Sequence, residues 1–112
     1  MKIITPNPPD KKHLEEIKKK MEKMGSPTIR MVDRDDHLVA IEGSHRLHSA
    51  RDMKLPVVVK LVDPEKFTIN HDFKDLPKKI RIGELAKNVE KSPQSYVTIP
   101  DDRLEFTNER SA

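Results

Sequence analysis

The sequence contains no cysteine and no tryptophan, and these absences exclude several classes of protein. Without cysteine there can be no disulfide, no thiolate chemistry and no zinc-finger site. With one tyrosine and three phenylalanines, an aromatic platform for stacking single-stranded bases is not expected. No apolar run is long enough for a membrane span, and the first residues, MKIITPNPPD, lack the core of a signal peptide. We therefore expect a cytoplasmic protein without a membrane partner.

Hydrophobic residues make up 34% and charged residues 37% of the 112-residue chain. Such a polar chain of this length suits one domain with a single modest core and frayed ends. The formal charge is +3, but the 22 lysines and arginines are nearly matched by 19 aspartates and glutamates. A continuous cationic face is therefore not implied, although a partner that carries phosphate is compatible with this charge.

The first quarter of the chain predicts an extended segment followed by a helix. The prolines among residues 6–9 prevent a helix there, and Asp10 is of a residue type that caps the start of one. Over residues 11–24 apolar side chains recur at steps of three and four, which is the pattern of one helix face, and Gly25 is a typical stop. The apolar residues of this face are Leu14, Ile17, Met21 and Met24.

Two strands, a second helix and a third strand are predicted next. Segments 27–33 and 37–42 predict a hairpin, because the turn sequence DRDD separates them. A short helix is expected from Ser44 to about Lys54, with Leu47 and Ala50 facing inward. The following run, PVVVKLV, is β-branched and almost continuously apolar, which is typical of a strand covered on both faces.

The patterns weaken beyond residue 63. Phe67 and Ile69 fit a short strand, and SYVTIP fits another. Residues 82–89 fit a short amphipathic helix that Ser92-Pro93 would end, and the tail from Arg103 looks loose. The order of elements predicts an α+β fold: a small mixed sheet with a hairpin, two flanking helices and a C-terminal appendage.

The stretch EGSHR, residues 42–46, stands where a predicted strand ends and a predicted helix begins. A helix that starts there presents free N–H groups and the positive end of its dipole, which attract anions. Gly43 lets a ligand approach the backbone, and Ser44 can donate its hydroxyl. His45 and Arg46 add side-chain donors, and an arginine fits two phosphate oxygens. Capping by Ser44 with the next two side chains in solvent explains the spacing equally well, so both interpretations stay open.

The order of motifs over residues 3–62 resembles the ParB and sulfiredoxin superfamily. The matching segments are ITPNPPD, IKKKMEKMGSPTIRMV, LVAIEGSHRLHSA and LPVVVKLV, with GSHRLHSA as the family's box. The resemblance implies a ParB/sulfiredoxin-like core at residues 1–66. We expect residues 67–112 to be an extension packed on the same domain, with a partly disordered tail.

The resemblance implies that the box holds a nucleoside triphosphate, such as ATP or CTP, together with Mg²⁺. Its phosphates would lie at the start of the second helix, and its base and sugar near the polar face of the first. The phosphate-binding residues implied are Gly43, Ser44, His45 and Arg46, and those near the base and sugar are His13, Glu16 and Lys20.

Two alternatives follow from other members of the superfamily. A ParB-like partition, regulatory or nuclease-like module would use the same residues on nucleic-acid backbone phosphates. A protein similar to the free serine kinases, whose box also contains GxHR, would be a phosphotransferase with Asp10 as its catalytic base. We favour the alternative that Asp10 caps the first helix.

Two departures from the family and the position of one acidic turn argue against some of these functions. Sulfiredoxin's reactive cysteine falls at Ser44, whose alcohol cannot perform that redox-coupled chemistry without a strong base, so sulfinic-acid reduction is ruled out. The residues after Val62 are too few for the helix-turn-helix and dimerisation domains of full ParB proteins. The carboxylates of DRDD lie at a predicted hairpin tip, where they are expected to form the turn instead of a nuclease metal cluster.

A metal site would require a third ligand beside His45 and His48, which lie three residues apart on the predicted helix. Asp52 or His71 could supply it, but exposed histidines are more usual on a helix. We therefore expect no metal site formed by the protein itself.

Overall fold

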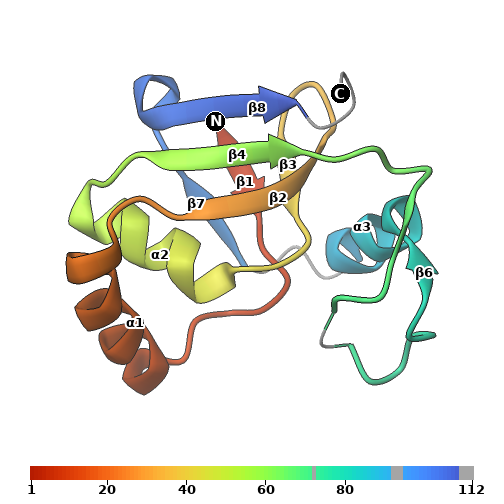
Figure 1. The fold of residues 1–112 in the computed structure, drawn as a ribbon, viewed down its shortest axis with the longest axis horizontal. Coiled ribbons are helices and arrows are strands. Elements are labelled where there is room, and N and C mark those ends of the chain that lie inside the picture. Colours follow the sequence, from red (N-terminus) through yellow and green to blue (C-terminus); the bar gives the residue numbers. More distant parts are fainter. Residues whose placement is uncertain (72, 92–94, 109–112) are drawn as a thin grey trace.

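The computed structural model describes residues 1–71, 73–91 and 95–108. The strands are β1 Lys2–Ile4, β2 Thr28–Asp33, β3 Leu38–Ala40, β4 Val57–Leu61, β5 Phe67–Thr68, β6 Ile80–Arg81, β7 Tyr96–Thr98 and β8 Leu104–Asn108. The helices are α1 Lys11–Met24, α2 Ser44–Met53 and α3 Ile82–Glu90, with a 3-10 turn at Asp101–Arg103. The fold is α+β, as predicted: a six-stranded mixed sheet in the order β7-β1-β3-β2-β4-β8 packs against the helices, and β5 pairs with β6 separately (Figure 1).

Local signals in the sequence place both ends of α1. The Asp10 carboxylate accepts a hydrogen bond from the Lys12 N–H at 3.1 Å, which satisfies one of the free amides of the first turn. Gly25 ends the helix with a φ of 78°, and its N–H donates to Met21 O at 2.8 Å. The predicted helix over residues 11–24 is therefore confirmed at both ends.

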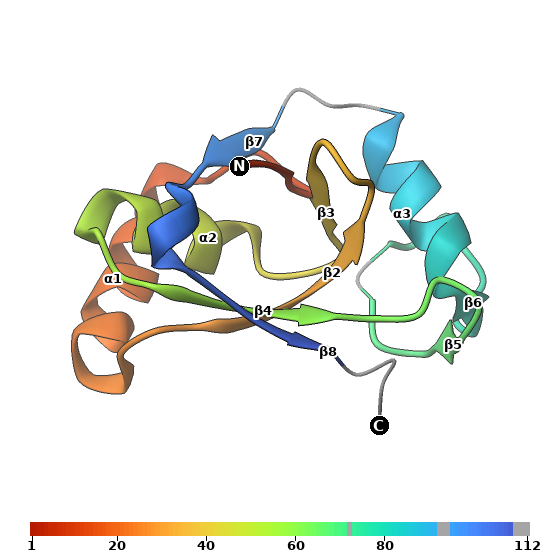
Figure 2. The ribbon, with the colours of Figure 1, turned by 90° about the horizontal axis from the view of Figure 1, so that it is seen from above.

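The side chains of the sheet alternate between two hydrophobic clusters, one on each face. In β2, Ile29 and Met31 face the cluster under α1 and α2, whereas Val32 faces the cluster under α3. Figure 2 shows that the α1–α2 pair and α3 lie at opposite ends of the sheet. α3 covers only part of its face, so Val58 in β4 stays half-buried. The prediction that this strand is covered on both faces is wrong for that reason.

Both edges of the sheet come from the last part of the described chain. β7 pairs antiparallel with β1, and β8 pairs parallel with β4 in the register Val57 with Leu104 and Leu61 with Asn108. The predicted loose tail is therefore wrong over residues 104–108, because the open edge of β4 supplies partners that local pattern cannot reveal. Residues 109–112 and the predicted helix stop at Ser92-Pro93 lie outside the described residues.

In the described ranges, no helix has the length and apolarity that crossing a bilayer requires.

Substitution of Leu47 tests how much the packing of α2 against the core contributes to the free energy of unfolding. The Leu47 side chain is completely buried, so Leu47→Ala should lower the free energy of unfolding by about 2–5 kcal/mol. The control Met24→Ala removes a side chain that is 80% exposed and should change it by less than about 0.5 kcal/mol. Urea denaturation measures the change in unfolding free energy for both variants. An equally small change in the two would contradict the position of Leu47 in the core.

Candidate functional site

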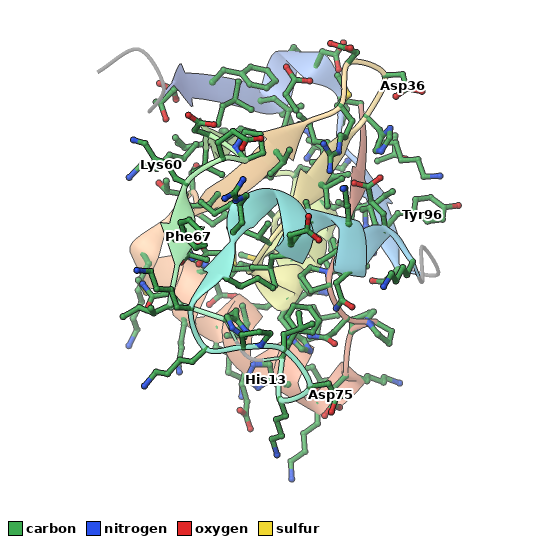
Figure 3. The ribbon with its side chains drawn as sticks, turned by 90° about the vertical axis from the view of Figure 1, so that its right-hand side faces the viewer. His13, Asp36, Lys60, Phe67, Asp75 and Tyr96 are labelled. Atoms are coloured by element: carbon green, nitrogen blue, oxygen red, sulfur yellow. The ribbon has the colours of Figure 1, made fainter. Side chains whose placement is uncertain are left out.

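A cavity of about 510 Å³ lies at the beginning of α2. Pro6, Asn7, His13 and Ile17 line it on the side of the lead-in and α1. The residues that open α2 form its polar end, here called the α2 start and defined as Gly43, Ser44, His45 and Arg46. Across the cavity lies the far wall, defined as Ile69, Asn70, His71 and Phe73. Figure 3 labels His13 of α1, and Phe67 and Asp75, which stand on either side of the far wall in the sequence.

The first amides of α2 are directed to the cavity end of the helix and have no intrahelical acceptor. The first hydrogen bond of the helix runs from the Leu47 N–H to Gly43 O at 2.9 Å. No side chain caps the helix. The Ser44 hydroxyl instead accepts a hydrogen bond from the Asn7 N–H at 3.1 Å, which fixes the lead-in beside the helix. The capping alternative for Ser44 is therefore not observed, and the dipole end of α2 remains available to an anion.

Gly43 permits a close approach between the backbone and two side chains. Its φ of 77° lies in the left-handed region. A Cβ at this position would lie 2.5 Å from Ile29 Cδ1 and 3.2 Å from Arg46 Nη2. The position therefore needs glycine both for its conformation and for space.

Two guanidinium groups share one carboxylate at the floor of the cavity. Arg30 Nε donates to Glu42 Oε2, and Arg46 Nη2 donates to Glu42 Oε1 at 3.3 Å. Arg46 Nη1 also donates to Thr28 O at 3.4 Å. The three ionised side chains are each roughly a quarter to two fifths exposed (22%, 33% and 38%) and leave one net positive charge at this point. Arg46 is therefore paired with a carboxylate of the cavity itself and not with a remote one.

Arg30 also holds the segment that leads to the far wall. Its Nη1 donates to Thr68 Oγ1 at 3.4 Å and its Nη2 donates to Asn70 O at 3.3 Å. The sequence predicted a half-buried strand around Arg30 but no role for it or for Glu42. Alternation along β2 places the Arg30 side chain on the sheet face opposite α1, and only the return of the chain after β4 brings its partners near.

The histidines of the α2 start and of α1 form a contact that sequence spacing did not predict. The rings of His13 and His45 meet edge to face with centroids 4.3 Å apart. His45 Nε2 accepts a hydrogen bond from the Asp10 N–H at 3.0 Å, which requires a ring without a proton on that nitrogen. Burial and the neighbouring His13 both lower the pKa of His45, against the opposing effect of Asp10. His45 is therefore a neutral ring in this arrangement.

The remaining sequence-predicted site residues lie elsewhere. Glu16 Oε2 lies 3.9 Å from His13 Nδ1 and does not line the cavity. Lys20 lines a separate hollow of about 350 Å³, to which Arg46 also contributes. The Asp10 carboxylate serves as the cap of α1 and is not part of the cavity lining.

His48 does not line the cavity and lies in a buried polar cluster. Its Nε2 lies 3.5 Å from Ser95 Oγ, which also donates to Asn7 O at 2.8 Å and hydrogen-bonds Thr5 Oγ1. Burial, followed by the positive charge of Arg51, lowers the pKa of His48, while Asp52 opposes the shift. This cluster joins α2 to the lead-in and to the start of β7.

The described residues contain no group of three side chains arranged to hold a metal ion. Glu42 is the one carboxylate in the described cavity lining, and both its oxygens already accept from arginines. His71 is also engaged, since its Nε2 donates to Pro77 O at 2.8 Å. The residues do not fit a Mg²⁺ ion held by the protein, so an ion in this cavity would have to be carried by the ligand's phosphates.

Comparisons of the chain with protein-family models, curated proteins and solved structures give no match.

Gly43→Ala tests the close approach at the α2 start. With φ 77° and ψ 30°, the left-handed backbone alone should cost an alanine about 1–2 kcal/mol of unfolding free energy. A further 1–3 kcal/mol or so is expected because the new Cβ would lie 2.5 Å from Ile29 Cδ1, which must move. Ile29→Val removes that methyl group, so it should relieve the further loss when combined with Gly43→Ala. Strictly additive losses in urea denaturation of the single and double variants would show that the space beside Gly43 is not restricted.

The buried His48 predicts a loss of stability in mild acid. Because its pKa is lowered on folding, the unfolded chain takes up the proton first as pH falls below the usual histidine value of about 6.5. The free energy of unfolding should therefore fall between about pH 7 and pH 5, with His48 contributing at most about 1.4 kcal/mol per pH unit. His48→Gln should flatten this slope in urea denaturations, and an unchanged slope would contradict the prediction.

Proposed function

We propose that this protein binds a nucleoside triphosphate, with the phosphates at the α2 start. The observation that carries the proposal is a cavity of about 510 Å³ that is lined by the uncapped start of α2 and by Arg46. This volume lies within the range of about 300–1,000 Å³ that small-ligand sites occupy. Free amides and a guanidinium at one end of such a cavity favour a compact group with several anionic oxygens.

The pairing of Arg46 with Glu42 is compatible with anion binding. At 3.3 Å and with both side chains more than 30% exposed, the pair is worth at most about 1 kcal/mol. A guanidinium has five donors, and the contacts to Glu42 and Thr28 use only part of them. Phosphate oxygens can therefore engage Arg46 without first breaking a strong interaction.

The concave shape of the site favours a small ligand over a nucleic-acid duplex. The far wall faces the α2 start across the cavity, and a duplex backbone needs an open surface along which several phosphates are contacted in succession. Asp10 caps α1 instead of lining the cavity, so the proposal is one of binding and includes no phosphoryl transfer.

Calorimetry with ATP, CTP, GTP and ADP, each with and without Mg²⁺, tests the proposal. At least one triphosphate should bind more tightly than about 1 mM, and Arg46→Ala should weaken it by about 10- to 150-fold, the effect of one charged hydrogen bond. The control Arg51→Ala removes the same charge from α2 at a residue that pairs with Asp52 outside the cavity, and it should change affinity less than about twofold.

Two outcomes would contradict this assignment. One is the absence of binding by every nucleotide at millimolar concentration. The other is an equal loss of nucleotide affinity in Arg46→Ala and Arg51→Ala, which would mean that only the overall charge of α2 attracts the ligand. Binding to duplex DNA that weakens with salt at a slope near −0.9 per contacted phosphate would favour the nucleic-acid alternative.

A further inference from the structure

The cavity has two chemically different ends. The α2 start provides backbone amides, a hydroxyl and a guanidinium, whereas the far wall contributes the apolar side chains of Ile69 and Phe73. A ligand that is anionic at one end and carries an apolar group at the other would make use of both ends. A bare polyphosphate would use only the α2 start.

Ile69 has no structural reason to be apolar. Its side chain is 58% exposed, and it belongs to neither hydrophobic cluster of the described residues. It lies one residue beyond β5 and lines the cavity. Phe73 lies at the margin of the cluster under α3 and lines the same cavity, so part of its surface is also available to a ligand. An exposed and a half-buried apolar side chain on one wall of a cavity are typical of contacts to a ligand.

The far wall is held in place before any ligand arrives. Arg30 donates to Thr68 Oγ1 and to Asn70 O from one guanidinium, and the Asn70 N–H donates to Thr68 Oγ1 at 3.1 Å. His71 is held from outside the wall, since its Nε2 donates to Pro77 O at 2.8 Å, and its Nδ1 accepts from the Phe73 N–H at 3.2 Å. Residues held in this way lose little entropy when a ligand binds.

Asn70 adds a polar group to this apolar surface. Its backbone oxygen is used by Arg30, but its side-chain amide has no hydrogen-bond partner in the described part of the chain. An amide donates and accepts at the same time, so it matches a ring that presents a donor and an acceptor on one edge. Nucleobases have this property, and their faces are apolar enough to lie against isoleucine and phenylalanine.

We infer that the far wall binds the nucleobase. Ile69 and Phe73 would contact the face of the base, and the Asn70 side-chain amide would hydrogen-bond to its edge. This inference rests on the proposed function. It places the base on the C-terminal extension, and not beside Glu16 and Lys20 on α1, which lie outside the cavity lining. The wall would then determine which nucleotide the protein prefers, while the α2 start holds the phosphates common to all.

Calorimetry with inorganic tripolyphosphate, ATP, CTP and GTP separates the contributions of the two ends of the cavity to ligand affinity. The wild-type protein should bind its preferred nucleotide at least about tenfold more tightly than tripolyphosphate, since only the nucleotide reaches the far wall. Ile69→Ser should lower the affinity for that nucleotide by about 5- to 30-fold. The affinity for tripolyphosphate should change by less than about twofold. The control Phe106→Ser changes an exposed apolar residue of β8 outside the cavity and should alter neither ligand.

Asn70→Ala provides the second test, because it should reduce the difference in affinity among the three nucleotides without affecting tripolyphosphate. Arg46→Ala should lower the affinities for nucleotide and for tripolyphosphate by similar factors. If Arg46→Ala has this effect but Ile69→Ser and Asn70→Ala leave nucleotide binding unchanged, the inference is overturned and the proposed function stands. Equal wild-type affinity for tripolyphosphate and nucleotide would also overturn it. If neither ligand binds the wild-type protein, the proposed function fails and this inference fails with it.

Discussion

The guanidinium of Arg30 connects three segments of the chain, and the candidate site depends on that connection. From the centre of the sheet it donates to Glu42 at the end of the β2–β3 hairpin, to Thr68 at the end of β5 and to the backbone of Asn70. A lysine could not reach all three acceptors, because its donors radiate from a single atom. Without this residue the beginning of the far wall would lose its hydrogen bonds to the sheet.

The balance of charge in the cavity explains how it can be open to anions without being strongly basic. Glu42 neutralises one of the two arginines, and the lowered pKa of His45 keeps that ring neutral beside His13. What remains is the dipole of α2 with its free amides and one uncompensated positive charge. Directional hydrogen bonds of this kind select for the shape of an anion more than for its total charge.

The parts of the fold that were predictable from sequence are those that local chemistry determines. Asp10 and Gly25 mark the ends of α1, and Leu47 and Ala50 lie in the core as their spacing predicted. The contribution of β8 was not predictable, since its pairing depends on the free edge of a strand more than 40 residues earlier. The same holds for the site. The α2 start was predicted from five consecutive residues, but Arg30 and the far wall meet only through the return of the chain after β4.

The placement of β7 and β8 has a consequence for how the protein is made. On a ribosome, β1 and β4 are made long before the strands that cover their outer edges. The edge of β1 therefore stays unpaired until β7 has been made, and the edge of β4 until β8 has been made. Productive folding of the sheet is thereby postponed until both strands have been made, and during that interval the exposed edges are open to other chains. Chaperone binding to the partly synthesised polypeptide would protect these two edges.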